Sequence, residues 1–326
     1  MTAPHPAEAA IRLAVRAALP GPGGAVLVAC SGGPDSLALA AATAWEAPRA
    51  GVLAGAVTVD HGIQAGSDAV ARQAAEACRR LGLSPVEIAA VAVPPGPNLE
   101  ARARDARYAA LAAAAGRARA VAVLLGHTMD DQAETVLLGL ARGSGARSLA
   151  GMAPVRGLYR RPLLGVRRAD TQAACSAAGL EPWADPMNQP GGEHPSRRAE
   201  LRGRALPVLA QVLGPGLVPA LARTAEALRA DNEHLENLAA QALARAGIGG
   251  GIETEVLARE PDAVRRRALR LAALAWGAAP GALARSHIDA LDALVVRWRG
   301  QGPADLPGGL RVGRECGMLK ASPPIR

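Results

Sequence analysis

The sequence predicts an α/β domain built on a parallel sheet, followed by a smaller and mainly helical C-terminal domain. From residue 24 to about residue 130, short apolar segments rich in Val, Leu or Ile alternate with helical segments. Strands separated by helices of this length form parallel sheets that are covered on both faces. Beyond residue 205 long helical segments replace the alternation. The expected domains are therefore 1–210 and 211–326.

The first domain is expected to place several polar residues at the ends of its strands. The expected strands are 25–30, 52–59, 86–91 and 120–126, and the expected helices are 35–48, 67–82 and 99–117. Ligands of doubly covered parallel sheets bind beyond the carboxyl ends of the strands. Ser31, Asp60 and His127 follow three of these strands. We expect these three residues to meet in one crevice.

The composition and the periodicity of the chain change beyond residue 141. Residues 142–204 carry eleven arginines against five acidic residues, and Gly and Pro interrupt any regular periodicity. A long helix is expected over 216–246, where it reaches a cluster of glycines. Helices over 253–276 and 283–298 and a hairpin near 306–309 complete the expected second domain.

Composition restricts the class of protein. The 326 residues carry a net charge of +8, and every basic residue except Lys320 is arginine, which binds phosphate in a bidentate manner. The four cysteines are far apart and form no CxxC pair, so neither a disulfide framework nor a zinc site is expected. No apolar run is long enough to span a membrane. We expect a soluble cytoplasmic protein without a membrane partner.

The segment 31–36 lies where the first strand becomes a helix. Its two adjacent glycines allow several backbone N–H groups to point at one anion beside a helix N-terminus, which is the geometry of a phosphate site. It is not a Walker A loop, because no Gly-Lys-Ser/Thr follows at the required spacing. An ordinary turn between strand and helix is the alternative. The segment matches the SGGxDS loop of enzymes that split ATP between the α and β phosphates, through Ser31, Gly32, Gly33, Pro34, Asp35 and Ser36.

Three acidic residues gather at the start of the helix that follows the fourth strand. Asp130, Asp131 and Glu134 follow His127 and share one helix face, because they are spaced three and four residues apart. A capping box between Thr128 and Asp131, with acids favoured by the helix dipole, explains part of this pattern. Clustered carboxylates also repel one another and need a cation, either Mg²⁺ or an ammonium group. The pattern therefore favours an ATP site whose second substrate is an amine.

Three further segments leave two interpretations open. The motif VDHG at 59–62 can contact the adenine or ribose of a nucleotide, or merely cap the next segment. The arginine-rich helix start at 98–108 can be a solvated face, and RGSG at 142–145 can be a helix C-cap as well as an anion-binding loop.

Taken in order, these segments resemble the tRNA(Ile)-lysidine synthetase family. Further matches are RPLLGV at 161–166, DPMN at 185–188, RRAELRGRALPVL at 197–209, PDAVRRRALR at 261–270 and RGQGPADLPGG at 299–309. The motif GHTMDDQAET followed by RGSG is narrower than SGGxDS, which the wider superfamily shares. The chain departs from the family at Thr58, Met187 and Glu200, where histidine, serine and a basic residue are common.

The resemblance implies a carbon–nitrogen ligase that acts on the wobble cytidine of a tRNA(Ile) with a CAU anticodon. Adenylation of the cytosine O2 by ATP releases pyrophosphate, and L-lysine then displaces AMP to form lysidine, so that the codon read changes from AUG to AUA. ATP and Mg²⁺ are the implied cofactors, and a homodimer is compatible with the family.

The resemblance also implies roles for individual residues. The loop 31–36 would hold the phosphates, with Asp60, His61 and His127 also contacting the nucleotide. Asp35 and Asp130 would bind Mg²⁺, whereas Asp131 would deprotonate the lysine amine and Glu134 would anchor it. Arg107 and Arg202 would stabilise charge on the phosphates. The expected tRNA contacts are Arg142, Arg147, Arg197, Arg198, Arg204, Arg265, Arg266 and Arg267.

Two other functions share some of these features. Another ATP pyrophosphatase, such as a tRNA sulfur transferase, would be expected to carry paired cysteines, and an amidotransferase would need a glutaminase domain or an N-terminal cysteine. A non-catalytic RNA-binding module would be expected to have lost the loop or the carboxylates, yet Asp35, Asp130, Asp131 and Glu134 are all present.

Overall fold

The computed structural model describes residues 4–62, 66–94, 96, 98–143, 145–185, 196–248 and 250–322. It divides the chain into two compact units, Met1–Ala227 and Leu228–Arg326. The division falls within the helix α10 (Leu217–Ala246), so this helix begins in the first unit and ends in the second. The limits 1–210 and 211–326 remain a proposal for the functional domains.

The first unit contains a six-stranded sheet in the order β3-β2-β1-β4-β6-β5. Neighbouring strands are parallel, except that β5 is antiparallel to β6. The four expected strands are confirmed within one or two residues, whereas the short edge strands β5 and β6 were not expected. The strands are β1 (Ala25–Ala29), β2 (Leu53–Asp60), β3 (Val86–Ala90), β4 (Ala122–Leu125), β5 (Val155–Arg156) and β6 (Tyr159–Arg160).

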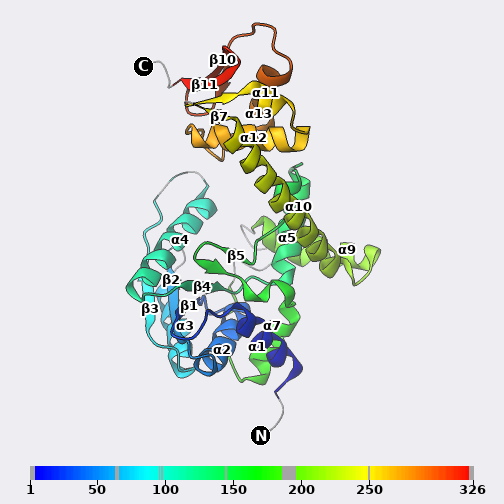
Figure 1. Cartoon of the computed structure of the whole chain (residues 1–326). Helices are drawn as coiled ribbons and strands as arrows, with labels where there is room; N and C mark the ends of the chain where they lie inside the picture. Colours follow the sequence, from blue (N-terminus) through cyan, green and yellow to red (C-terminus); the bar gives the residue numbers. More distant parts are fainter. Residues whose placement is uncertain are drawn as a thin grey trace. The chain divides into compact units, whose positions relative to one another are not determined.

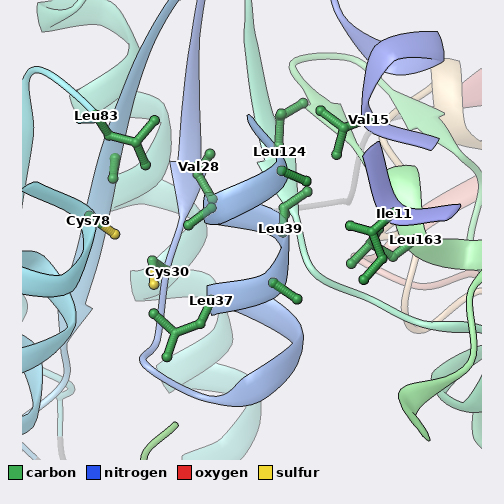
Figure 2. Packing of buried hydrophobic residues seen from close by; sticks show 14 of the residues in the cluster. Ile11, Val15, Val28, Cys30, Leu37, Leu39, Cys78, Leu83, Leu124 and Leu163 are labelled. Atoms are coloured by element: carbon green, nitrogen blue, oxygen red, sulfur yellow. The ribbon is translucent and has the colours of Figure 1, made fainter. Parts of the chain in front are cut away.

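Helices cover both faces of this sheet (Figure 1). Successive side chains of a strand point to opposite faces, so Val26 and Val28 pack on one side and Leu27 on the other. Figure 2 shows Leu39 and Leu37 of α2 on the side of the sheet that carries Val28. The helices on that side are α1 (Pro6–Ala18), α2 (Pro34–Arg49), α3 (Ser67–Arg80) and α7 (Arg168–Ala177), and α4 (Leu99–Arg117) packs on the other.

The segment 142–204 is more regular than the sequence indicated. It contains α6 (Ala146–Leu149), the 3₁₀ turn η1 (Pro162–Gly165), α7 and α8 (Arg197–Glu200), after which the π-helical turn η3 (Leu201–Ala205) leads into α9 (Leu206–Leu213). The helix α7 was missed because its buried face consists of Thr171, Ala174 and Cys175, which give a weak hydrophobic period. Met187 and the rest of 186–195 lie outside the described residues.

The second unit combines helices with an antiparallel sheet that the sequence indicated only in part. The single helix expected over 253–276 is two helices, because Pro261 stands at the N-cap of the second and cannot continue the first. The expected hairpin is confirmed between β9 and β10, where Gly308 and Gly309 have positive φ. The strand order is β7-β8-β11-β10-β9. The elements are β7 (Gly247–Ile248), β8 (Gly251–Glu253), α11 (Thr254–Ala258), α12 (Asp262–Ala275), α13 (Arg285–Val296), β9 (Ala304–Leu306), β10 (Leu310–Glu315) and β11 (Met318–Ser322).

Within the described residues, no single helix is both long and apolar enough to cross a membrane. The segments Arg197–Leu213 and Leu217–Ala246 meet the length and composition criteria only as a pair, and the two are bent by 95° at the break.

Candidate active site

The loop between β1 and α2 has the geometry of an anion site. Gly32 has φ +85°, a conformation that side chains with a Cβ rarely adopt, and Pro34 begins the helix where a missing N–H is harmless. The Ser36 hydroxyl accepts a hydrogen bond from Ser31 N at 3.1 Å and donates one to Gly33 O at 2.9 Å. This internal hydroxyl closes the loop, and no described side chain caps the first N–H groups of the 16-residue helix. The expected position of the loop between strand and helix is confirmed.

The two strands that flank β1, β2 and β4, carry polar side chains near this loop. Among the described residues, no hydrogen-bond partner reaches three buried atoms: the ring Nδ1 atoms of His61 and His127 and the hydroxyl of Thr58. Burial, reinforced by the charge of Arg107, lowers the pKa of His61. Burial also lowers the pKa of His127, to about 3. Both rings are therefore neutral at physiological pH and lie at the edge of the sheet where β2 and β4 end.

Arg107 and Asp60 lie at the same edge of the sheet. Arg107 projects from α4 with its guanidinium carbon 5.5 Å from the centre of the Tyr108 ring. Burial lowers the pKa of Arg107, and its charge reaches both His61 and His127. Asp60 accepts a hydrogen bond from Gly62 N at 3.0 Å, so one of its oxygens fixes the local turn.

The end of β4 packs directly on the phosphate loop. A Cβ on Gly126 would lie 3.1 Å from the backbone C and O of Asp35 and 3.2 Å from Ser36 Cα. We expect Gly126→Ala to push this loop aside and to weaken ATP binding by about tenfold, which corresponds to about 1.4 kcal/mol and lies within the usual cost of overpacking. Gly116→Ala is the control, because a Cβ there meets nothing within 4 Å. Titration of each variant with ATP measures the effect, and unchanged affinity of Gly126→Ala would contradict this packing.

The acidic residues lie at the start of α5 (Met129–Ala141), and the expected capping box explains part of the cluster. Asp131 Oδ2 accepts hydrogen bonds from the Thr128 N–H at 2.8 Å and the Thr128 hydroxyl at 2.9 Å, so the capping box is present. The second oxygen, Oδ1, points away from the cap and accepts from Arg168 Nη2 at 2.6 Å. Capping therefore accounts for one oxygen of Asp131, and an arginine that the sequence analysis missed accounts for the other.

Arg168 is the residue that connects the carboxylates. It stands at the first position of α7, and its guanidinium contacts Asp35 Oδ2 at 3.3 Å and Glu134 Oε1 at 3.1 Å in addition to Asp131. Its backbone N–H donates to Asp130 Oδ2 at 2.8 Å. One residue thus joins the phosphate loop on α2 to all three acidic residues on α5.

Two more arginines complete the cluster. Arg167 forms a bidentate pair with Asp130, at 3.1 and 3.0 Å. Arg202, from η3, binds both oxygens of Glu134, with Nε–Oε1 at 2.7 Å and Nη2–Oε2 at 3.1 Å. Arginine side chains therefore compensate the charge of the acidic cluster. Arg167 and Arg168 lie directly after RPLLGV, which was the only local signal for them.

The pKa values follow from this arrangement. Burial would raise the pKa of Asp131, but the Arg168 charge and the hydrogen bonds from Thr128 outweigh it and hold the pKa below its ordinary value. Burial would also raise the pKa of Asp130. The hydrogen bonds from the Arg167 side chain and the Arg168 backbone outweigh burial and lower this pKa. At Asp35 burial prevails, so its pKa is raised although Thr171 and Arg168 bind it.

The two aspartates expected to bind Mg²⁺ differ in how far they suit it. Among the described residues no group of three or more His, Cys, Asp or Glu side chains is arranged to hold a metal ion. Asp35 receives one donor on each oxygen, from Thr171 and Arg168, which leaves lone pairs for a ligand. Asp130 Oδ2 already accepts from both Arg167 and Arg168. Asp35, whose buried charge is incompletely compensated, is therefore the better fit.

The arginines expected to contact tRNA fall into two groups. Arg142, Arg147, Arg197 and Arg204 are exposed, and Arg204 pairs with Glu200 at 3.0 Å. Arg198 Nη2 contacts the Thr135 hydroxyl at 3.4 Å.

The arginines of α12 are more strongly engaged. Arg265 is only 6% exposed and is held by Asp292 at 2.7 Å and by Asp262, so it serves the packing of the second unit. Arg266 pairs with Asp289 and Asp292, and Arg267 Nη2 bonds to Asn232 Oδ1 at 2.8 Å.

Comparison with known proteins identifies both units. The PP-loop domain family matches residues 10–209, and the TilS substrate binding domain matches residues 253–319. The tRNA(Ile)-lysidine synthase of Thermobifida fusca is 53% identical over 99% of both chains, and that of Streptomyces coelicolor is 51% identical over 97% of this chain and 98% of its own.

Among solved structures, the U34-tRNA thiolase NcsA from Methanococcus maripaludis with its [4Fe-4S] cluster shares the fold. The TM-score is 0.55 at 18% identity, over 68% of this chain and 78% of that one. The expected parallel-sheet fold is thereby confirmed, and the full-length identity of about half decides between families that share it. The chain belongs to the tRNA(Ile)-lysidine synthase family of PP-loop proteins.

Proposed function

We propose that this protein uses ATP to join L-lysine to C2 of the wobble cytidine in a tRNA(Ile) with a CAU anticodon. One observation carries the proposal: a single guanidinium, that of Arg168, touches Asp35 of the phosphate loop as well as Asp131 and Glu134. A phosphate site and a site with an affinity for cations are therefore adjacent. An enzyme that activates a substrate with ATP and then adds an amine needs this adjacency.

The first step would be adenylation of the cytosine. The base oxygen O2 attacks the α-phosphorus of ATP, a new O–P bond forms, and pyrophosphate leaves toward the N–H groups of the loop 31–36. Arg107 is a candidate to stabilise charge on the phosphate oxygens, because its charge already reaches His61 and His127 beside the loop. Asp35 would be the main protein ligand of Mg²⁺, which supplies further positive charge to the phosphates, and Asp130 would be the second.

The second step would be attack by the ε-amine of lysine. Glu134, whose side chain is fully buried, would anchor the ammonium, and Asp131 would accept its proton. The free amine then forms the N–C2 bond, and the C2–O2 bond breaks so that O2 leaves with AMP. Adenylation is needed because the oxygen of the base carbonyl is otherwise a poor leaving group.

Sulfur transfer, the chemistry named for the thiolase with the same fold, is not favoured. The chain has four cysteines, of which Cys30, Cys78 and Cys175 are buried in the first unit and Cys316 belongs to the second. Within the described residues no three His, Cys, Asp or Glu side chains are placed to hold a metal ion. The cluster of carboxylates and arginines around Arg168 suits an amine substrate better.

Label transfer tests the proposed function directly. The purified protein is mixed with ATP, labelled L-lysine and a tRNA(Ile) transcript that carries the CAU anticodon. We expect label on the tRNA, and no label when the wobble cytidine is replaced by uridine, because uridine carries a carbonyl where cytidine has its amino group. The proposal fails if no label is transferred, or if the uridine transcript is labelled equally.

We also propose that the protein acts in the cytoplasm, where thiols are kept reduced. The family resemblance allows a homodimer. Exposed arginines of the first unit would contribute phosphate contacts, which supply most of the affinity of proteins for RNA.

A further inference from the structure

Arg202 occupies the position that the lysine ammonium would need. Its guanidinium binds both oxygens of Glu134, at 2.7 and 3.1 Å, and lies 3.5 Å from Asp131 Oδ1. These two carboxylates are the proposed anchor and base. An ammonium group and this guanidinium cannot both bind Glu134 Oε2 in the same geometry, so one must leave when the other binds.

Arg202 is held less firmly than its neighbour Arg168. Arg168 bonds to carboxylates on two helices, α2 and α5, and its backbone N–H is fixed to Asp130. Of the described elements Arg202 bonds only to α5, and its side chain is 29% exposed against 16% for Arg168. It projects from the five-residue π-helical turn η3. Of the two cations, Arg202 is the one that can leave without disconnecting the phosphate loop from α5.

Glu134 cannot be left without a second partner. Its side chain has no exposed surface, and among the described residues its Oε2 accepts a hydrogen bond only from Arg202. A buried carboxylate that loses a cation incurs a large penalty unless another donor takes its place. A lysine ammonium, with three N–H donors and a positive charge, replaces what the guanidinium supplies. Departure of Arg202 and entry of lysine are therefore a single exchange.

Arg202 also needs a destination for its charge. The phosphate loop lies on the other side of Arg168, whose guanidinium spans the distance between Asp35 and Glu134. Phosphate oxygens attract guanidinium groups strongly and bind them in a bidentate manner. A nucleotide bound at this loop therefore offers the anion that draws Arg202 away from Glu134.

We infer that Arg202 is an exchangeable counter-ion. It occupies the ammonium site until ATP binds and the phosphates attract it away, so that nucleotide and lysine bind cooperatively. The inference rests on the proposed function, because it takes lysine as the amine. It adds an order to the reaction: lysine is admitted to its anchor once ATP is present. Because binding free energies are reciprocal, lysine must raise the affinity for nucleotide by the same factor.

Calorimetric titration of the full chain tests this coupling. L-lysine is titrated into the protein alone and into the protein saturated with α,β-methylene-ATP, which cannot be cleaved at the relevant bond. We expect the nucleotide to tighten lysine binding by about tenfold or more, within the range of typical coupled sites. The reverse titration, nucleotide with and without lysine, must give the same factor.

Two variants assign the coupling to Arg202. Arg202→Ala removes the competing cation, so we expect it to bind lysine without nucleotide more tightly than the wild type does, and to lose the coupling. Arg204→Ala is the matched control, because Arg204 lies on the same turn but pairs with Glu200 and should leave the coupling intact. Thermal unfolding verifies that the variants are folded, and the wild-type coupling stands as a test on its own.

The outcomes separate the two proposals. If the wild type binds lysine equally with and without nucleotide, or if Arg202→Ala keeps the full coupling, the exchange is wrong. Label transfer to tRNA would then still support the proposed function. If the wild type neither binds lysine nor transfers it, both proposals fail together.

Discussion

Replacing Asp131 by asparagine is expected to lower the rate of lysine transfer by about 10³-fold, the middle of the range for loss of a general base. The amide cannot accept the proton of the lysine ammonium, so the amine stays protonated and cannot attack C2. The first step does not use this carboxylate as a base, so pyrophosphate release with tRNA and ATP in the absence of lysine should be nearly unchanged. Label transfer and pyrophosphate release measure the two steps separately.

Two controls distinguish loss of the base from loss of stability or of a helix-capping charge. Asp131 also caps α5 through Thr128, so the free energy of unfolding of Asp131→Asn must be compared with that of the wild type. Asp68→Asn is a control for charge in a first helical turn, since Asp68 opens α3 and pairs with Arg72 away from the crevice. If Asp131→Asn transfers lysine at the wild-type rate, the base is another residue. If only KM for lysine rises, Asp131 is an anchor.

The parts of the site that the sequence predicted are those encoded by adjacent residues. The phosphate loop needs two glycines and a serine within six positions, and its place between β1 and α2 follows from the flanking apolar pattern. The capping box and the acidic face of α5 lie within seven residues for the same reason. Local steric and hydrogen-bonding rules therefore predicted the loop, the carboxylates and the strands that carry them.

What the sequence could not indicate is the partner of each charge. Arg168 stands 133 residues from Asp35 and 37 from Asp131. Apart from the RPLLGV motif before it, nothing in its local pattern distinguishes it from the other arginines of an arginine-rich chain. Arg202 and Arg265 show that similar local sequences can lead to different partners. Both belong to arginine-rich segments, yet one reaches the carboxylates of α5 and the other is buried in an ion pair of the second unit. Long-range pairing is a property of the fold, not of the segment.

Removal of the Arg168 charge is expected to give the largest loss of stability of any single change at the site. Arg168→Met leaves the three carboxylates of Asp35, Asp131 and Glu134 without their shared cation. Removing one partner from a buried ion-pair cluster costs about 3–5 kcal/mol, because the remaining charges are desolvated and repel one another. Chemical denaturation at pH 7 measures this loss. Arg168→Lys should recover part of it, since an ammonium keeps the charge but cannot reach three carboxylates in the same geometry.

A surface pair provides the comparison for that variant. Arg72 and Asp68 form an ion pair of similar length, 2.7 Å, with both side chains more than half exposed. Arg72→Met should change the free energy of unfolding little, because solvent screens such pairs. A loss at Arg168 no greater than the loss at Arg72 would mean that the cluster is not a buried network.

The pH dependence of stability should also change in Arg168→Met. In the wild type the pKa values of Asp130 and Asp131 are lowered on folding, so their stabilisation is complete above about pH 4 and is lost as the pH falls through the folded-state values. Without Arg168 we expect burial to outweigh the remaining contacts of Asp131, so that its pKa rises above that of the unfolded chain, as burial already raises the pKa of Asp35. The folded variant then binds more protons than the unfolded one, so acidification from pH 7 toward about pH 5 should stabilise it. Denaturation at several pH values measures the slope. A variant whose stability does not rise on acidification over this interval, as expected of a cluster still compensated by Arg202, contradicts the central role assigned to Arg168.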